Sequence, residues 1–333
     1  MKAAVRDRFG SPEDVVELRE FDTPEPAEGE VLVRVRSASV NTSDWYDVTG
    51  RPLVGRVQSG LRGPKSNRLG TDYAGVVEAL GPGVTELAVG DEVFGGRDGA
   101  FAEYICARVD RSITPKRADV TFEEAAAVPV AGLTALQALR DKGQLQPGQH
   151  VLIHGASGGV GTYAAQIAKA LGGVVTAVCS TRNVDQARSL GADRVVDYVQ
   201  EDFTRGGERY DLMIDIAGTR SWRGCTRVLA SSATVVVVGG PRANRFLGPL
   251  GHAVGMKLGS LFGGRKAVFF VAKFNRPDMQ TLRELLESGK VRPAISDRFP
   301  LDDIVGALRH QGEGHPSGKI VIDVSASRMP HPV

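Results

Sequence analysis

Cysteine is scarce in this chain of 333 residues, which contains Cys106, Cys179 and Cys225 and no other thiol. Three thiols so far apart cannot form the disulfide framework of a small secreted protein or a four-cysteine zinc cluster. No apolar run reaches the roughly 18 residues that a membrane-spanning helix needs. Residues 1–9 lack the apolar core of a signal peptide, so we expect a cytoplasmic protein with no membrane partner.

An excess of charge of one sign is also missing. The chain has 41 lysines and arginines against 39 acidic residues, a net charge of +2. Proteins that hold nucleic acid on a basic face are usually far more basic, so we expect no nucleic-acid partner. A length of 333 residues with 42% hydrophobic residues predicts about two globular domains.

The first 120 residues contain short strands separated by glycine and proline turns. Residues 31–36, 75–80 and 101–105 are rich in valine and aromatic side chains, and Gly81-Pro82-Gly83 follows the second of these segments. Closely spaced short strands of this kind predict an antiparallel sheet or partial barrel.

From residue 121 onward, predicted helices alternate with predicted strands. An alanine-rich helix over 123–139 precedes a strand at 151–154, and a helix over 160–171 precedes a strand at 174–179. Further strands are expected at 194–196, 212–215 and 234–238. Alternation of this kind predicts βαβ units around a parallel sheet, and the continuous valine runs are typical of strands buried on both faces.

The pattern changes again near residue 270. Helices are expected over 279–288 and 302–310, and a last strand over 319–324. We therefore predict a domain over 1–124, a dinucleotide-binding domain over 125–270, and a return to the first domain over 271–333, with an unpacked tail after residue 324.

A glycine-rich loop lies between the predicted strand at 151–154 and the following helix. It matches the dinucleotide-binding fingerprint with alanine in place of the first glycine. Gly158 lets the backbone approach a pyrophosphate, and Gly161 lets helix and strand pack closely. The helix N-terminus offers unpaired N–H groups to the anion. The predicted phosphate-binding residues are Ala156, Ser157, Gly158, Gly159, Val160 and Gly161.

The end of the next strand indicates which nicotinamide cofactor is used. NAD-specific sites place a carboxylate there, but this sequence has Ser180, Thr181 and Arg182. Hydrogen-bond donors and a guanidinium favour the 2′-phosphate, so we predict NADPH as the cofactor. The alternative is a solvated turn with an exposed arginine.

These features together resemble the medium-chain dehydrogenase/reductase superfamily, in its zinc-independent quinone oxidoreductase and enoyl reductase branch. The resemblance covers nearly the whole chain. It is carried by the glycine loop and by six further segments: 40–46, 70–75, 89–94, 131–135, 191–193 and 314–319. It implies an α/β fold, with a GroES-like partial β-barrel catalytic domain and a Rossmann domain that holds a doubly wound parallel sheet.

The sequence departs from the zinc alcohol dehydrogenases of this superfamily at their metal ligands. Asn41 stands where they have a catalytic cysteine, and Thr71-Asp72 stands where they have His-Glu. Their structural zinc lobe has four cysteines, whereas Cys106 stands alone here. Catalytic zinc needs three protein ligands, so we predict no metal.

The resemblance implies catalytic roles for Asn41, Asp44 and Tyr46. Tyr46 is the candidate hydrogen-bond donor to the substrate oxygen, Asn41 would orient cofactor or substrate, and Asp44 would hold the loop. The open alternatives are a packing role for Tyr46 and a helix cap for Asp44. Further implied cofactor contacts are Thr134, Tyr198, Gly239, Gly240, Phe269, Phe270, Val271 and Lys319.

Several of these contacts have structural alternatives. Thr134 can be a small residue for helix packing, Tyr198 a strand-end aromatic residue, and 269–271 simple core. Lys319 can be a solvated lysine at the start of a strand. His154 is expected to be a hydrogen-bonded strand-end histidine. Residues 51–69 and 241–266 form long segments, which by analogy with the family flank the cleft and shape substrate access, cover a subunit interface, or only decorate the surface.

The predicted function is reduction of a quinone or an α,β-unsaturated carbonyl compound by NADPH without zinc. Two alternatives stay open: a biosynthetic tailoring reductase or alcohol dehydrogenase of the same fold, and a cofactor-binding protein without catalysis. By analogy with the superfamily, we expect a homodimer formed through an edge strand of the Rossmann domain.

Overall fold

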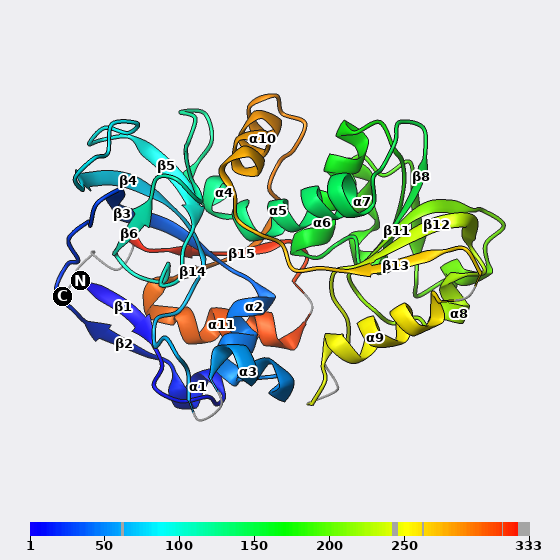
Figure 1. Ribbon diagram of the computed structural model, residues 1–333, viewed down its shortest axis with the longest axis horizontal. Helices are drawn as coiled ribbons and strands as arrows, with labels where there is room; N and C mark the ends of the chain where they lie inside the picture. The colour runs from blue at the N-terminus through cyan, green and yellow to red at the C-terminus, as the bar shows by residue number, and fades with distance from the viewer. Residues whose placement is uncertain (61–62, 242–245, 262, 315, 326–333) are drawn as a thin grey trace.

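The computed structural model describes residues 1–60, 63–241, 246–261, 263–314 and 316–325. Two lobes lie side by side along the long axis of the molecule, each built on its own sheet (Figure 1). The first lobe contains both the start and the end of the described chain, and the second lobe contains the middle.

The sheet of the first lobe has seven strands and is mostly antiparallel. Its order is β14-β15-β3-β4-β5-β7, and β6 also pairs with β3. The predicted antiparallel unit is therefore confirmed. The strands are β3 (Glu30–Val40), β4 (Asp72–Leu80), β5 (Glu92–Gly96), β6 (Tyr104–Arg108), β7 (Ile113–Pro115), β14 (Ile295–Pro300) and β15 (Lys319–Asp323).

Strand β15 joins the end of the chain to its beginning. It lies antiparallel to β3, with Ile320 opposite Val40 and Asp323 opposite Ser37. Residues 319–323 thus complete a sheet that starts with residue 30. This pairing brings the residue before Ile320 close to the residue after Val40.

Short elements surround this sheet. A hairpin of β1 (Lys2–Val5) and β2 (Glu17–Glu20) forms a separate two-stranded sheet. Helix α11 (Ile304–Glu313) packs against α2 (Thr42–Thr49). The other short elements here are α1 (Pro12–Val15), the 3₁₀ turns η1 (Leu53–Gly55) and η5 (Leu301–Asp303), and α3 (Arg56–Ser59).

The second lobe contains six parallel strands in the order β10-β9-β8-β11-β12-β13. This is the doubly wound order of a dinucleotide-binding fold, with its switch point between β8 and β11. The predicted parallel sheet is confirmed. The strands are β8 (His150–His154), β9 (Val174–Cys179), β10 (Arg194–Asp197), β11 (Tyr210–Asp215), β12 (Leu229–Val237) and β13 (Lys266–Phe269).

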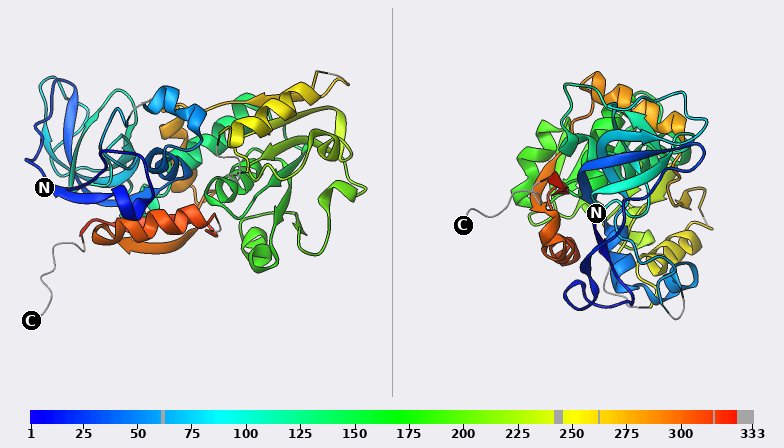
Figure 2. Two further views of the ribbon diagram at one scale, coloured as in Figure 1. Left: turned by 90° about the horizontal axis from the view of Figure 1, so that it is seen from below. Right: turned by 90° about the vertical axis from the view of Figure 1, so that its left-hand side faces the viewer.

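Helices and turns connect these strands. Figure 2 shows that helices lie on both faces of the sheet. The elements are α6 (Gly159–Ala170), η3 (Thr181–Asn183), α7 (Val184–Ser189), η4 (Phe203–Arg205), α8 (Trp222–Cys225) and α9 (Pro249–Gly259).

Three local predictions need correction. The single helix expected over 123–139 is divided into α4 (Phe122–Ala126), α5 (Pro129–Gln137) and a π turn, η2 (Ala138–Lys142). Pro129 explains the break, because proline has no N–H and is tolerated in the first turn of a helix but not in its interior. Helix α9 lies within the segment that the sequence presents as a long loop. Strand β13 was not predicted either.

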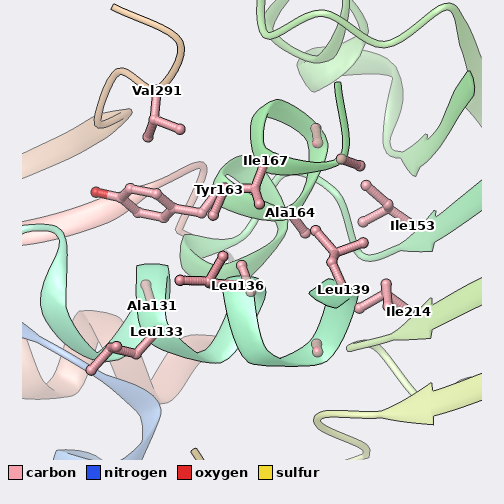
Figure 3. Packing of buried hydrophobic residues seen from close by; sticks show 14 of the residues in the cluster. Ala131, Leu133, Leu136, Leu139, Ile153, Tyr163, Ala164, Ile167, Ile214 and Val291 are labelled. Atoms are coloured by element: carbon pink, nitrogen blue, oxygen red, sulfur yellow. The ribbon is translucent and has the colours of Figure 1, made fainter. Parts of the chain in front are cut away.

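Buried aliphatic side chains fill the space around α5 and α6 (Figure 3). Tyr163 of α6 is fully buried, and its hydroxyl donates a hydrogen bond to the carbonyl of Ala127 at 3.0 Å. Met279 and Leu282 of α10 (Arg276–Glu287), together with Val291, belong to the same cluster. This core therefore joins α6 of the second lobe to α5 and α10.

No helix among the described residues is both long and apolar enough to cross a membrane.

The glycine at position 161 is required by the packing of α6 on its own loop. A Cβ atom at Gly161 would lie 2.2 Å from the carbonyl oxygen of Gly155. We therefore expect Gly161→Ala to lower the free energy of unfolding by about 1–3 kcal/mol, measured by urea denaturation. Gly255→Ala on α9, where a Cβ meets no atom within 4 Å, is the matched control. It should leave stability unchanged or raise it, and equal losses in both variants would contradict the explanation.

Candidate active site

A lysine, an asparagine and an aspartate meet in the interior of the first lobe. The ammonium group of Lys319 donates to Asn41 Oδ1 at 2.5 Å and lies 3.4 Å from Asp72 Oδ2. The amide group of Asn41 donates to the same Asp72 oxygen at 2.9 Å, and Ser39 donates to it at 3.1 Å. Both polar ends of the Asn41 side chain are therefore held.

Three neighbouring strands create this arrangement. Asn41 directly follows β3, Asp72 begins β4 opposite Ser39, and Lys319 begins β15. The order β15-β3-β4 places the three side chains at one end of the sheet, although they come from distant parts of the chain.

The charged pair is fully enclosed. Lys319 is 2% exposed and Asp72 is not exposed. Burial lowers the pKa of Lys319 and raises the pKa of Asp72, and each group opposes the shift of the other. A buried charge is tolerated when it is paired and hydrogen-bonded, which is the case here.

The alternative interpretation of Lys319 as a solvated lysine is wrong. Its side chain is buried and runs beside the N-terminus of α6, where a Cβ on Gly159 would lie 3.1 Å from Lys319 Cδ. The lysine thus connects the glycine loop of the second lobe to Asn41 in the first lobe. Its burial was missed because both hydrogen-bond partners lie more than 240 residues away in the sequence.

Asp44 caps helix α2, as the helix-cap alternative predicted. Asn41 is the N-cap residue, and its backbone N–H donates to Asp44 Oδ2 at 2.7 Å. Thr71 donates to the other carboxyl oxygen at 3.3 Å. Burial raises the pKa of Asp44 to about 8, with smaller contributions from the nearby carboxylates Asp72 and Asp47.

Two further predicted residues lie on the adjoining helices. Tyr46 is half-buried in α2, and its ring lies 5.4 Å from that of Trp45. Thr134 in α5 donates to the carbonyl of Val130 at 2.6 Å, while the N–H of Val130 donates to Asp72 at 3.0 Å. The first turn of α5 is therefore anchored to the buried carboxylate.

The glycine loop has the shape of an anion site. Gly155 has a φ of +96°, which favours glycine, and Gly158 is the N-cap of the twelve-residue helix α6. A Cβ on Gly158 would meet only Gly155 O, at 3.9 Å, so the space in front of the helix is open. Ala156 is buried, while Ser157, Gly159 and Val160 are partly exposed. The loop therefore fits the pyrophosphate of a dinucleotide.

The end of β9 combines hydrogen-bond donors with an unexpected carboxylate. Ser180 accepts from the Asn183 amide at 3.1 Å, and Arg182 is exposed. The hydroxyl of Thr181 donates to Asp197 at 2.6 Å. The sequence did not point to Asp197, because this residue ends β10, whereas the carboxylate of NAD-specific sites is expected at the end of β9.

The remaining predicted cofactor contacts lie at the carboxyl ends of β10, β12 and β13. Tyr198 is 54% exposed and follows β10. Gly239 and Gly240 follow β12, and a Cβ on Gly239 would lie 2.4 Å from Ile216 O. Phe269 and Val271 are 43% and 74% exposed, so their interpretation as core is wrong, whereas Phe270 is half-buried.

A second buried hydrogen-bond network lies at the switch point of the parallel sheet. Asp215 at the end of β11 accepts from His154 Nδ1 at 2.8 Å and from His252 Nε2 at 2.7 Å. Burial alone would raise the pKa of Asp215, but these two hydrogen bonds lower it to about 2. Thr219 contacts the other ring nitrogen of His154 at 3.0 Å. His154 is thus hydrogen-bonded as predicted, and the network joins β8 to α9.

The described residues offer no cluster of metal ligands. Among the described residues, no three histidine, cysteine, aspartate or glutamate side chains are gathered as metal ligands would be. The positions that resemble the zinc site hold Asn41, Thr71 and Asp72, which are engaged with one another or with Asp44 and Lys319. Zinc independence stays a prediction.

Comparison with known proteins agrees with this geometry. Residues 27–117 match the model of the alcohol dehydrogenase GroES-like domain, and residues 190–322 match a model described as zinc-binding dehydrogenase. The chloroplastic quinone oxidoreductase QR1 of Triphysaria versicolor is 31% identical over 97% of this chain and 98% of its own. The trans-enoyl reductase pgmF of Aspergillus terreus is 32% identical over 89% of this chain and 86% of its own.

A solved structure shows the same likeness. The quinone oxidoreductase of Escherichia coli, crystallised with NADPH, superposes with a TM-score of 0.81 at 25% identity, over 97% of this chain and all of the other. The shared fold and the site define a nicotinamide-dependent oxidoreductase. The chain belongs to the medium-chain dehydrogenase/reductase superfamily, in its quinone oxidoreductase-like branch.

The Lys319–Asp72 pair predicts a strong coupling between two substitutions. Lys319→Met leaves Asp72 buried without a cation, so we expect it to lower the free energy of unfolding by about 3–5 kcal/mol. Adding Asp72→Asn removes the uncompensated charge and should recover much of that loss. Urea denaturation of the single and double variants measures the coupling. Additive losses would contradict a direct interaction between the two groups.

The raised pKa of Asp44 predicts a pH-dependent stability. The folded state holds the proton up to about pH 8, whereas the unfolded state releases it near pH 4. The contribution of Asp44 to stability is therefore fully present below about pH 4 and is lost as the pH rises towards about 8. Asp44→Asn, which stays neutral, should lose less stability than the unmodified chain between about pH 5 and about pH 8 in urea denaturation. Parallel pH profiles would show that Asp44 does not carry this proton.

Proposed function

We propose that this protein is a zinc-independent, NADPH-dependent oxidoreductase that reduces a quinone or an α,β-unsaturated carbonyl compound. The observation that carries the proposal is the buried Lys319, which lies beside the glycine loop and holds Asn41 together with Asp72. This lysine supports the proposal because it joins the glycine loop to a buried, hydrogen-bonded polar site. The relatives named above support the substrate class, because one is a quinone oxidoreductase and another an enoyl reductase.

The residues available for the cofactor fit its parts. The open N-terminus of α6 would bind the pyrophosphate through backbone N–H groups at Gly158 and its neighbours. When bound, NADPH supplies a hydride to the substrate. Thr134, Gly239, Gly240 and the 269–271 segment are proposed to surround the nicotinamide half, and Tyr198 the adenine half.

The preference for NADPH rests on Ser180 and Arg182. A guanidinium stabilises a 2′-phosphate through charge-assisted hydrogen bonds. The sequence suggested Thr181 as a further donor to the 2′-phosphate, but its hydroxyl donates to Asp197 instead. The carboxylate of Asp197, which lies beside this turn, would repel a 2′-phosphate. The preference for NADPH therefore depends on Arg182, the cationic side chain predicted at this turn.

The chain's own residues can stabilise the substrate without a metal ion. Hydride addition to the carbon of a conjugated carbonyl moves an electron pair to the oxygen, which then takes a proton. The hydroxyl of Tyr46 is our candidate hydrogen-bond donor to that oxygen, with water as the alternative proton source. Asn41 acts as a positioning residue, because both ends of its amide are already bound. Asp44 positions α2 through the helix cap.

The proposal also includes the location and assembly of the protein. We place it in the cytoplasm as a homodimer that forms along β13, the edge strand of the six-stranded sheet. An edge strand leaves one row of backbone groups unpaired and is a common pairing surface.

Two other functions are compatible with the same site. A reductase or alcohol dehydrogenase dedicated to one biosynthetic intermediate would act on one compound and not on a range of quinones and enones. A non-catalytic protein would bind NADPH tightly without turnover, and Tyr46→Phe would change nothing measurable.

The test is oxidation of NADPH and NADH by a panel of quinones and enones, with and without a metal chelator. We expect turnover with NADPH in the presence of the chelator and about tenfold lower kcat/KM with NADH. Arg182→Ala should remove most of this difference. Arg188→Ala is the control, because Arg188 is exposed on α7 and pairs with Asp185. Tyr46→Phe should lower kcat while NADPH binding is kept.

Three results would overturn parts of the proposal. Activity only after addition of zinc would reject the metal-free reaction. Equal use of NADH and NADPH, unchanged in Arg182→Ala, would reject the cofactor preference. Tight NADPH binding without turnover across the whole panel would favour the non-catalytic alternative.

A further inference from the structure

One buried cation of the first lobe has no counter-charge. Among the described residues, Arg6 and Lys319 are the two lysine or arginine residues that are more than nine-tenths buried, with exposed fractions of 4% and 2%. Lys319 is paired with Asp72, whereas the Arg6 side chain forms neither a hydrogen bond nor an ion pair in the described part of the chain. A buried charge is costly unless it is paired. Arg6 therefore lacks an anionic partner.

The carboxylates near Arg6 do not supply that partner. Asp44 and Asp47 of α2 attract Arg6 electrostatically, but they form no ion pair with it. Burial raises the pKa of Asp44 to about 8, so this carboxyl group is mostly uncharged at neutral pH. Asp47 is exposed, and water screens its charge. Asp7 is already engaged, because both of its carboxyl oxygens accept from Arg19, at 3.2 Å and 2.5 Å.

Arg6 lines a cavity of about 430 Å³ on the first lobe. Two further cations line it, Lys65 and Arg68, which belong to the basic segment 51–69 whose role the sequence left open. Both are exposed and form no ion pair with any described carboxylate. The other residues of its wall are Asp7, Pro64, Ser66 and Asn67. Three cations thus face one carboxylate, which Arg19 already neutralises.

Backbone pairing fixes the positions of these cations. Arg6 directly follows β1, and its N–H donates to the carbonyl of Asn67 at 2.8 Å. The N–H of Leu69 donates to the carbonyl of Ala4 at 3.3 Å, so the chain before β4 runs beside the end of β1. The guanidinium group of Arg6 lies 5.7 Å from the centre of the Phe9 ring. The cationic wall is therefore built by the fold.

We propose that this cavity binds the phosphate group of a small molecule, with Arg6 as its main contact. Phosphate oxygens accept charge-assisted hydrogen bonds from guanidinium and ammonium groups, and Ser66 and Asn67 can add a hydroxyl and an amide donor. The bound anion would balance the buried charge of Arg6. A volume of about 430 Å³ lies within the range of small-molecule sites. The phosphates of NADPH are assigned above to the second lobe, so this site is additional to them.

A larger cavity adjoins the first one and reaches the candidate active site. It has a volume of about 770 Å³, and Ser66 and Arg68 line both cavities. It extends to Thr71, whose hydroxyl donates to Asp44. Its walls also include three carboxylates, Glu25, Glu30 and Asp98. The smaller cavity is therefore the better place for an anion.

The phosphate group has two possible sources. It can belong to the substrate, which would extend from Thr71 to Arg6 through the adjoining cavity, and this source rests on the proposed reductase function. It can also be free phosphate that binds without a part in the reaction. The recognition chemistry is the same for both.

Thermal melting in inorganic phosphate tests the site. We expect the melting temperature of the full chain to be about 2 °C higher in phosphate than in chloride at the same pH and ionic strength, because the ligand stabilises the folded state. Arg6→Met should raise the apparent dissociation constant for phosphate at least about tenfold. Lys65→Met, at an exposed position, should raise it about threefold. Lys290→Met is the control, because Lys290 is exposed in the turn after α10.

Three results would overturn the proposal. One is the absence of any difference between phosphate and chloride. Another is equal stabilisation by phosphate of Arg6→Met and Lys290→Met. If Arg6→Met does not fold, equal stabilisation of Lys65→Met and Lys290→Met counts against the site in the same way. The third is loss of the phosphate effect in Arg182→Ala alone, which would place the phosphate in the dinucleotide site.

Steady-state kinetics distinguishes the two sources. If the phosphate belongs to the substrate, an enone with a phosphate ester should have a KM at least about tenfold lower than its uncharged analogue, and Arg6→Met should remove this difference. If free phosphate is the ligand, the two enones should share one KM while the melting effect stays. The melting assay contains neither enone nor NADPH. Its failure would therefore leave the proposed reductase function untouched, and absence of turnover would leave the phosphate site untouched.

Discussion

The ion pair between Lys319 and Asp72 is the constraint on which the rest of the site depends. Two opposite charges are held out of water, and each is tolerated only because the other is present. Asn41 lies between them and shares both partners, so its orientation follows from the pair. Through Val130 the carboxylate also fixes the first turn of α5, and through the lysine stem the pair touches the glycine loop. One buried interaction therefore aligns elements of both lobes.

The two lobes contribute different chemistry to this meeting point. The strands of the parallel sheet end at one edge, where a loop and a helix N-terminus offer unpaired backbone N–H groups. The antiparallel sheet contributes rigid side chains from three adjacent strands. Buried polar networks on each sheet, one around Asp72 and one around Asp215, hold these ends in place. The network around Asp215 takes no part in the proposed reaction. Its hydrogen bonds connect α9 to β8 and β11.

The fold could be predicted from the sequence wherever the signal was local. Valine runs, turn residues and the glycine loop predicted the parallel sheet. The change of pattern near residue 270 predicted that the chain returns to the first sheet. Helix α9 was not predicted, because Gly248, Gly251, Gly255 and Gly259 recur along it and glycine is a poor helix former. The burial of Lys319 and the carboxylate of Asp197 were missed for another reason. Their environments are made by strands that pair only in three dimensions, and no spacing along the chain records those pairings.

The position of β15 has a consequence for how the protein is made. The strand that supplies the lysine is separated from Asn41 by 278 residues, and the whole parallel-sheet lobe lies between them. During synthesis the chain emerges from its N-terminus, and domains tend to fold as units. The second lobe can therefore fold while the first lobe still lacks the strand beside β3. Until residues 319–323 leave the ribosome, Asp72 has no lysine, and β3 lacks its partner strand along residues 37–40, the part that β6 does not pair with. During synthesis we therefore expect a stage in which the parallel-sheet lobe is folded and the first sheet is incomplete, and chaperones or aggregation would act on the chain at that stage.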